Sequence, residues 1–150
     1  MAERHMVRIA AYLVPIRKGR VLLLRRLNSG WEDGNYGLPS GHVEPGETAS
    51  EAAAREAEEE AGIKASPLDL KFAHLIHRNA KGGDYEYVDV FFTADSWSGE
   101  PKIAEPDKCD HMDWFPLSNL PPNIVPSVRE TLEHIQAGVF YSEQQEGVGS

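Results

Sequence analysis

The stretch from Gly41 to Ile63, GHVEPGETASEAAAREAEEEAGI, constrains the fold of this chain more than any other segment. Thr48 and Glu51 have the spacing of a capping box, in which each side chain bonds the backbone N–H of the other residue. A helix is therefore predicted to begin near residue 49. Gly62 suits the left-handed conformation in which many helices end. The segment is predicted to form a loop, a capped helix and a glycine stop.

Small residues mark one face of this predicted helix. Alanine recurs there at intervals of three and four residues, at positions 49, 52, 53, 57 and 61. Alanine favours helix formation and allows a helix to approach a neighbouring layer closely. The helix is therefore predicted to pack on a β-sheet.

Three glutamates share another face of the helix. Glu56, Glu59 and Glu60 are three and four residues apart, so their carboxylates are neighbours and repel one another. They lie toward the C-terminal end, where the helix dipole opposes negative charge. A solvated acidic face is the ordinary interpretation of such a run. The alternative is a bound cation, because an arrangement this unfavourable indicates function and carboxylate oxygens suit Mg²⁺ or Mn²⁺.

The wider pattern favours the cation. The positions that match the Nudix box, G-x5-E-x7-R-E-U-x-E-E-x-G-U, are Gly41, Glu47, Arg55, Glu56, Glu59, Glu60, Gly62 and Ile63, with Ala57 as the apolar U. The chain therefore resembles the Nudix hydrolases. Its Arg25-Arg26 pair, the Gly-Leu-Pro before the box and the later Trp-Ser-Gly-Glu-Pro run resemble MutT-type members. The resemblance implies an α/β (α+β) fold, an α/β/α sandwich with a mixed central sheet. It also implies hydrolysis of a phosphoric anhydride by metal-activated water.

The resemblance gives the glutamates of the box separate roles. Glu59 and Glu60 correspond to metal ligands of the family, and Glu56 to a further ligand or to the base that activates water. The backbone carbonyl of Ser40, just before the box glycine, corresponds to another ligand. The implied cofactor is Mg²⁺, with Mn²⁺ as the alternative.

Two further assignments follow from the same resemblance. Arg55 and Glu47 correspond to a structural ion pair that holds the loop against the helix. A last catalytic carboxylate is expected after the Gly-Glu-Pro run, where Glu105 stands. An exposed loop glutamate is the alternative interpretation of Glu105. The other carboxylates in this segment that could take its place are Asp107 and Asp110.

Residues outside the box are expected to select the substrate. Arg26 matches the position from which MutT-like proteins reach the nucleotide, although a surface charge at a strand end is the alternative. Trp31 and Tyr36 lie in the loop over 27–37 and could stack on a base, while at least one of them is expected to pack in the core. Asn123 lies one residue away from the place of a base-reading asparagine in MutT-type enzymes, and a turn residue is the alternative.

The rest of the chain shows short apolar runs between turn residues. Strands are predicted over 6–16, 21–24, 68–77, 85–95 and 112–117, with a hairpin joining the first two, and a second helix is predicted over 125–137. Residues 142–150 are polar and are predicted to be a disordered tail. A single domain over 1–141 is the resulting expectation.

Composition limits the partners. A chain of 150 residues with 41% hydrophobic and 26% charged residues is typical of one soluble domain. A net charge of -9 argues against a nucleic-acid polymer or a membrane as partner. The N-terminus has no signal-peptide apolar region and the single cysteine, Cys109, excludes an internal disulfide, so a cytoplasmic location is expected. Monomer and homodimer both stay open.

These observations together predict a metal-dependent hydrolase that converts a nucleoside triphosphate, ordinary or modified, to the monophosphate and pyrophosphate. The chain lacks the additional N-terminal region and the downstream residues that mark ADP-ribose enzymes in the family, which favours triphosphates. An ADP-ribose or nucleotide-sugar pyrophosphatase is the first alternative. A non-catalytic nucleotide sensor is the second, and the intact box glutamates argue against it. An RNA-end hydrolase is disfavoured because no basic stripe is present.

Overall fold

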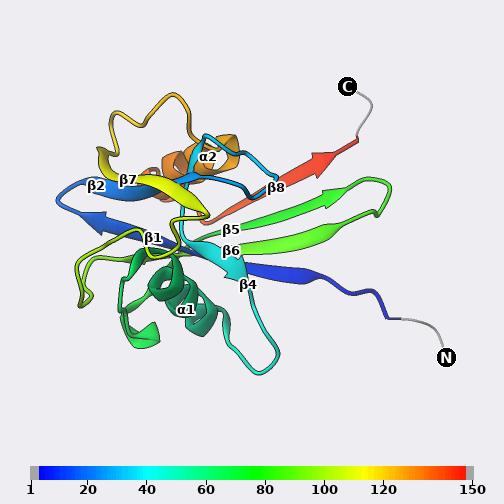
Figure 1. The fold of residues 1–150 in the computed structure, drawn as a ribbon. Coiled ribbons are helices and arrows are strands. Elements are labelled where there is room, and N and C mark those ends of the chain that lie inside the picture. Colours follow the sequence, from blue (N-terminus) through cyan, green and yellow to red (C-terminus); the bar gives the residue numbers. More distant parts are fainter. Residues whose placement is uncertain (1–3, 148–150) are drawn as a thin grey trace.

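The computed structural model describes residues 4–147. Within them, helices α1 (Ala49–Ala61) and α2 (Pro126–Gln136) lie on opposite sides of a mixed β-sheet (Figure 1). The strands are β1 (Arg8–Arg17), β2 (Arg20–Arg26), β3 (Tyr36–Gly37), β4 (Ser40–His42), β5 (Lys71–Ala80), β6 (Glu86–Ala94), β7 (Cys109–Pro116) and β8 (Tyr141–Glu146), and a short 3-10 turn, η1, spans Pro67–Asp69. This arrangement confirms the expected α/β/α sandwich.

Strand β1 is the centre of the sheet. It pairs in parallel with β6, antiparallel with β4, and forms the predicted hairpin with β2. β2 continues to β3 and β7, whereas β6 continues to β5 and β8. β4 and the start of the loop before α1 are thereby brought against β1, where the Val43 N–H donates to the Ile9 carbonyl at 2.9 Å.

Alternating side chains of β1 and β2 supply a core on each side of the sheet. Leu13 and Leu22 pack with Ala57 of α1, whereas Val14 and Val21 belong to the core under α2. The buried residues of α1 are all alanines. Because alanine side chains are short, the backbone of α1 lies close to the sheet, and its glutamates are carried to the edge of β4.

Both ends of α1 fall where the sequence predicts. The Thr48 side chain accepts a hydrogen bond from the Glu51 N–H, and the Glu51 carboxylate accepts one from the Thr48 N–H. Gly62 ends the helix in the left-handed region, with φ of 68°. These caps fix which residues of the helix face the site.

Strand β8 shows that the prediction of a disordered tail from residue 142 is wrong. Residues Tyr141–Glu146 pair in parallel with the outer edge of β5. The pairing uses backbone groups, so the polar side chains that suggested disorder do not prevent it. Ser142 adds a side-chain contact, since its Oγ lies 2.8 Å from Nε2 of the buried His74. Residues 148–150 lie outside the described residues.

Smaller differences concern strand limits. β5 continues to Ala80, past the predicted end at residue 77, and β7 begins at Cys109, before the predicted start at residue 112. β4 has only three residues, too few for a hydrophobic pattern to reveal. No helix among residues 4–147 is long and apolar enough to cross a membrane.

Candidate active site

Glu60 is the most enclosed glutamate of the box. It lies in the last turn of α1, and its Oε2 accepts a hydrogen bond from the Ser40 N–H at 2.9 Å. Burial, followed by the charges of Glu56 and Glu105, raises the pKa of Glu60 to about 9, although the bond from Ser40 opposes the rise. A carboxylate in this environment gains more than an exposed one from a nearby cation.

Glu56 packs directly against the box glycine. A Cβ atom at Gly41 would lie 2.1 Å from Oε1 of Glu56. A side chain would fit there only if the Glu56 carboxylate moved, so glycine at this position lets β4 and α1 meet with the glutamate between them. Gly41 thereby fixes where the Glu56 carboxylate lies.

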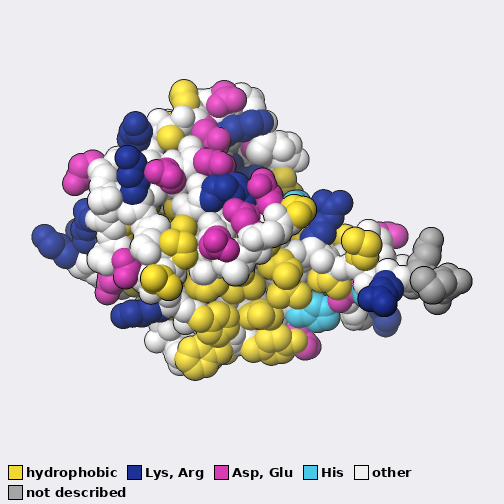
Figure 2. Space-filling model, turned by 90° about the horizontal axis from the view of Figure 1, so that it is seen from below, with side chains coloured by type: hydrophobic (Ala, Val, Ile, Leu, Met, Phe, Trp, Pro, Cys, Tyr) yellow, Lys and Arg dark blue, Asp and Glu magenta, His cyan; other side chains and the backbone are white. Residues whose placement is uncertain are grey.

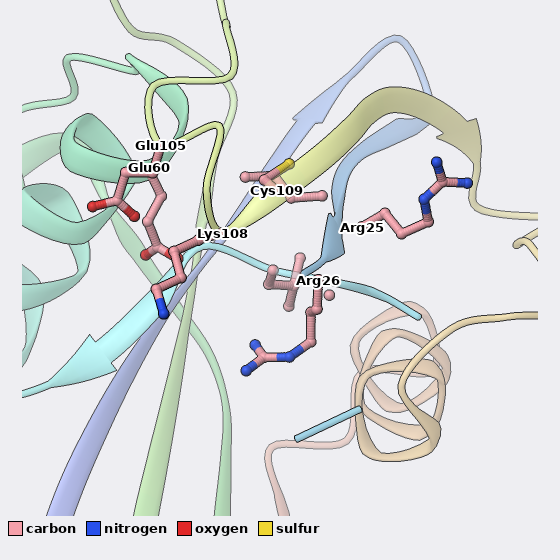
Figure 3. Close-up of a pocket in the computed structure, with 9 residues that line it drawn as sticks. Arg25, Arg26, Glu60, Glu105, Lys108 and Cys109 are labelled. Carbon is pink, nitrogen blue, oxygen red and sulfur yellow. The ribbon is translucent and has the colours of Figure 1, made fainter. Parts of the chain in front are cut away.

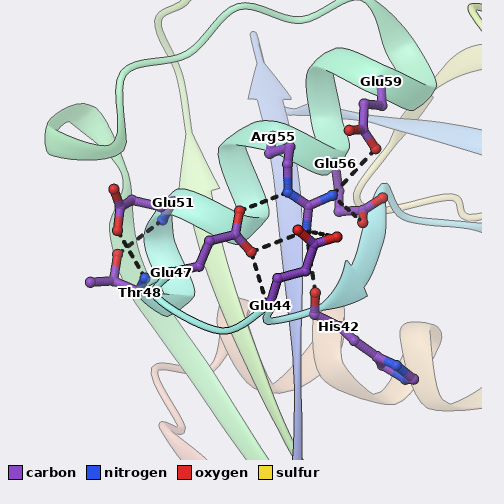
Figure 4. Close-up of polar contacts among 8 residues, drawn as sticks. All are labelled: His42, Glu44, Glu47, Thr48, Glu51, Arg55, Glu56 and Glu59. Atoms are coloured by element: carbon purple, nitrogen blue, oxygen red, sulfur yellow. Dashed lines mark hydrogen bonds and ion pairs between the residues drawn. The ribbon is translucent and has the colours of Figure 1, made fainter.

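Arg55 connects the loop before the helix to the glutamates (Figure 4). Its Nε and Nη2 donate to the two carboxylate oxygens of Glu47 at 2.7 and 3.1 Å, and Nη2 also donates to the His42 carbonyl at 3.3 Å. Its Nη1 donates to Glu56 at 2.8 Å and to Glu59 at 3.3 Å. The hydrogen bonds that Arg55 donates to Glu47 are the largest cause of the raised pKa of the guanidinium, which stays charged.

Glu105 comes to the same place from far down the chain. The Ala104 N–H donates to the Glu60 carbonyl at 3.2 Å, which docks this segment on the end of α1. Glu60 and Glu105 then line one hollow of about 40 Å³, together with Lys108 (Figure 3). Burial and the charge of Glu56 raise the pKa of Glu105. We call this hollow, together with the neighbouring Glu56 and Glu59 of α1, the carboxylate hollow.

The carboxylate hollow fits a divalent cation in its chemistry. Among residues 4–147, no three His, Cys, Asp or Glu side chains are already arranged around a common point as metal ligands. Arg55 holds Glu56 and Glu59 by the same Nη1 atom instead. The donors are nevertheless all carboxylate oxygens, the atoms that Mg²⁺ and Mn²⁺ prefer, and they are gathered at one end of a rigid helix.

A wider cleft of about 340 Å³ opens beside the glutamates. It is lined by Ala10 and Tyr12 of β1, Arg26 of β2, Trp31, the residues of β4, Arg78 of β5 and Tyr87 of β6. Arg26 also lines the carboxylate hollow. Its Nε donates to the Trp31 carbonyl at 2.8 Å, and its guanidinium lies 4.9 Å from the centroid of the Trp31 ring. The Trp31 residue is 54% exposed. We call this region the aromatic cleft.

Arg78 and Tyr87 form a second cation–aromatic pair in the aromatic cleft. The Arg78 guanidinium lies 4.2 Å from the centroid of the Tyr87 ring, and its Nε donates to Oδ2 of Asp89 at 2.6 Å. Asp89 is only 3% exposed, and its Oδ1 has no hydrogen-bond partner. Burial raises the pKa of Asp89, while the bond from Arg78 lowers it. Burial also raises the pKa of Tyr12, so its hydroxyl keeps its proton.

Two residues expected to bind substrate do not line the aromatic cleft. Tyr36 is 6% exposed, its ring packs in the core, and its hydroxyl lies 2.6 Å from Nδ1 of His111, so its prediction as a substrate contact is corrected. The Asn123 amide donates to the Gly34 carbonyl at 3.0 Å and holds the loop before the box. Asp110, one of the alternatives to Glu105, forms an ion pair with Arg25, whose Nε lies 2.7 Å from Oδ1 of Asp110.

Sequence reasoning did not identify the contributions of Tyr12, Arg78 and Tyr87 to the aromatic cleft. These residues come from different strands, and none belongs to a contiguous motif. The sequence contained one indication of this arrangement. Asp89 interrupts the apolar run YVDVFF, and a carboxylate buried in a strand requires a cationic or hydrogen-bonding partner from another strand.

Comparisons with known proteins agree with this geometry. The NUDIX domain family model matches residues 6–135. The chain is 32% identical over 119 residues to an oxidized purine nucleoside triphosphate hydrolase of Danio rerio, which covers 76% of this chain and 69% of that protein. It is 32% identical over 106 residues to an ADP-ribose pyrophosphatase of Methanocaldococcus jannaschii, with coverage of 70% and 59%. The crystal structure of a MutT NUDIX hydrolase from Burkholderia pseudomallei superposes with a TM-score of 0.76 and 31% identity, over 86% of this chain and 98% of that one.

The sandwich fold and the box therefore define an enzyme that hydrolyses phosphoric anhydride bonds. The chain belongs to the Nudix family. Members of this family generally depend on a divalent metal.

Proposed function

We propose that this enzyme is a divalent-metal-dependent pyrophosphohydrolase of nucleoside triphosphates, ordinary or with a modified base, and releases the monophosphate and pyrophosphate. One observation carries the proposal. Arg26 lines both the carboxylate hollow and the aromatic cleft, so a molecule with phosphates at one end and an aromatic base at the other can occupy both regions at once.

The carboxylate hollow would perform the chemistry. Glu56, Glu59 and Glu60, with the Ser40 carbonyl, would hold Mg²⁺ or Mn²⁺. When bound, such a cation neutralises phosphate charge and lowers the pKa of water. Glu56 and Glu105 are the candidates for the base that takes the proton of the attacking water. The raised pKa of Glu105 suits this task, since a base with a pKa nearer neutrality is the more effective one.

Cationic side chains would bind and orient the phosphates. Arg26 keeps its Nη atoms for a ligand, because its described side-chain hydrogen bond uses Nε. Lys108 lies in the carboxylate hollow and its ammonium donates to the Asn28 carbonyl at 3.0 Å, which holds it in place. The guanidinium of Arg26 and the ammonium of Lys108, which line the same hollow, would fix the phosphates for in-line attack.

The aromatic cleft would hold the nucleoside. The exposed Trp31 ring and the Tyr87 ring offer stacking surfaces. Arg78 lines the cleft and can donate to acceptors of a base. The similarity to a protein named as an oxidized purine nucleoside triphosphate hydrolase supports a purine.

One observation favours a second candidate, an ADP-ribose-like diphosphate. A further hollow of about 280 Å³ continues from the aromatic cleft, since both are lined by Tyr12, Trp31 and Arg78. It gives room for a second sugar beyond the first nucleoside. The similarity to a protein named as an ADP-ribose pyrophosphatase agrees with this candidate.

A panel of nucleoside triphosphates, oxidised purine triphosphates, ADP-ribose and nucleotide sugars would test both candidates. Each would be incubated with Mg²⁺ and, separately, with a chelator, and the products separated by chromatography. We expect triphosphates to give monophosphate and pyrophosphate only with Mg²⁺. Turnover of ADP-ribose alone would establish the second candidate, and binding without turnover would refute both.

A further inference from the structure

Helix α1 covers only part of its side of the sheet. A helix is about 10 Å wide and strands lie about 4.8 Å apart, so one helix covers about two strands. α1 packs on Ala11 and Leu13 of β1 and reaches Phe92 of β6. No residue of β5 or β8 belongs to the cores around α1 in the described part of the chain. The sheet therefore continues beyond the helix without a cover.

The uncovered strands present apolar side chains. The strand register places Leu75 beside both Val90 and Tyr141. Phe72 and Phe140 stack with a centroid distance of 6.2 Å. We call the surface formed by Ile9, Phe72, Leu75, Val90, Phe140 and Tyr141 the apolar face. Figure 2 shows a continuous hydrophobic surface on this side of the molecule, next to the charged surface over α1.

The apolar face has a size at which apolar patches on soluble domains are often functional. Phe72, Phe140 and Tyr141 are 48%, 61% and 51% exposed. At about 200 Å² for each fully exposed aromatic side chain, these rings together leave about 300 Å² open to water. The aliphatic residues bring the total to about 400–500 Å², the size at which a patch marks an interaction site. A stable interface buries about 800 Å² on each partner, of which about 60% is apolar, so the apolar face supplies the apolar area that a dimer requires.

We propose that the apolar face binds the same face of a second copy of this chain about a twofold axis. A sheet surface can meet its own copy, and twofold pairing is the commonest way in which soluble chains associate. The chain carries a net charge of -9, so two copies repel each other electrostatically. Contact through an uncharged surface keeps the charged groups of the two copies furthest apart. The titratable groups that register with this face, His77, Glu86 and Glu143, stand at its border. Acidic groups there disfavour an anionic membrane as the partner.

Such a dimer would leave catalysis undisturbed. Tyr12, Arg78 and Tyr87 of the aromatic cleft lie on the α2 side of the sheet, because they alternate with residues of the apolar face along their strands. None of the glutamates of the carboxylate hollow belongs to the apolar face. The dimer is therefore independent of the proposed substrate.

The molar mass in solution tests this inference. By light scattering across the micromolar range, the unmodified chain should have twice the 16.7 kDa mass of one copy. Phe72→Glu and Tyr141→Glu should each weaken dimerisation by at least about tenfold and give a single-copy mass, because they place a charge at the centre of the contact. Ser118→Glu, in an exposed turn after β7, adds the same charge elsewhere and should stay dimeric.

Circular dichroism would establish that each variant is folded. If the glutamate variants unfold, Phe140→Ser, which changes an exposed residue outside any strand, should still weaken the dimer. A single-copy mass of the unmodified chain would overturn the inference. So would a folded Tyr141→Glu variant with the dimer mass, or a monomer that binds vesicles of phosphatidylcholine and phosphatidylserine.

Discussion

The carboxylate hollow and the aromatic cleft, which meet at Arg26, differ in how their charged side chains are paired. In the carboxylate hollow, Glu60 and Glu105 repel each other and both have raised pKa values. In the aromatic cleft, Arg26 and Arg78 each lie over an aromatic ring and donate to an acceptor. Without a ligand, the repulsion between the glutamates destabilises the carboxylate hollow, whereas the arginines of the aromatic cleft already have partners. We infer that the carboxylate hollow performs catalysis and the aromatic cleft recognises the substrate. Variants of the two regions should therefore change different kinetic constants.

The largest effect is expected from the carboxylate hollow. Glu60→Gln replaces the most enclosed carboxylate of the hollow with an amide. Loss of a residue that merely supports a metal ligand lowers activity by roughly 10–100-fold, and loss of a proposed ligand should lower kcat by more than this. Glu58→Gln is the matched control, because Glu58 is an exposed neighbour on the same helix. Steady-state kinetics with saturating Mg²⁺ would measure both. Near-normal turnover of the Glu60→Gln variant would show that Glu60 has no role in catalysis.

Gly41→Ala should have the next largest effect, although it changes no charge. The added Cβ would lie 2.1 Å from Oε1 of Glu56 and must displace this carboxylate or β4. We expect kcat to fall by about 10–100-fold, the cost of misplacing a ligand through its surroundings. Gly82→Ala is the control, since no atom lies within 4 Å of its added Cβ. Equal kinetics of the two variants would show that the contact does not position Glu56.

Substitutions in the aromatic cleft should raise KM. Trp31→Ala removes a stacking surface worth about 1–3 kcal/mol, which corresponds to a rise in KM of about 5–150-fold with kcat little changed. Tyr36→Phe, which removes only the hydroxyl next to His111, should leave KM unchanged because that ring lies in the core. A fall in kcat without a change in KM for Trp31→Ala would contradict the division between the regions.

The smallest effect concerns stability without metal. The folded-state pKa of Glu60 is about 9, above the ordinary value of 4.5, so the folded protein keeps a proton that the unfolded chain releases. Stability should therefore fall as the pH rises from about 4.5 to about 9. In chelator, Tm should drop by at least a few degrees over this window, since each 1 kcal/mol of stability lost lowers Tm by about 2–4 °C at this size. Glu60→Gln should show a smaller drop, and an identical drop would assign the effect to other groups.

The contrast between the regions also explains what the sequence could predict. Glu56, Glu59 and Glu60 lie on one helix, and local rules of capping and helical spacing place them on one face without knowledge of the rest of the chain. Tyr36 and Trp31 lie five residues apart in one loop, and only the packing of that loop decides which ring turns inward. Arg78 and Tyr87 depend on the pairing of β5 with β6, which no local pattern specifies.

The fold was predictable for a related reason. Capping residues, apolar runs and glycines defined most elements, and the box supplied their architecture. β8 was missed because its backbone pairs with the open edge of β5, whereas its mostly polar side chains form no apolar pattern that predicts a strand. A strand of this kind cannot be recognised from composition.

The pairing of β8 with β5 has a consequence for synthesis. β5 precedes β8 in the sequence, so its outer edge stays unpaired until β8 has been made. During that interval Phe72 lacks Phe140 as a neighbour, and Leu75 lacks Tyr141. Nascent chains that stop before residue 140 would present an unpaired strand edge next to an exposed ring, the combination that promotes pairing with unrelated strand edges. Residues 140–146 thus protect this edge, and their loss should appear first as insolubility.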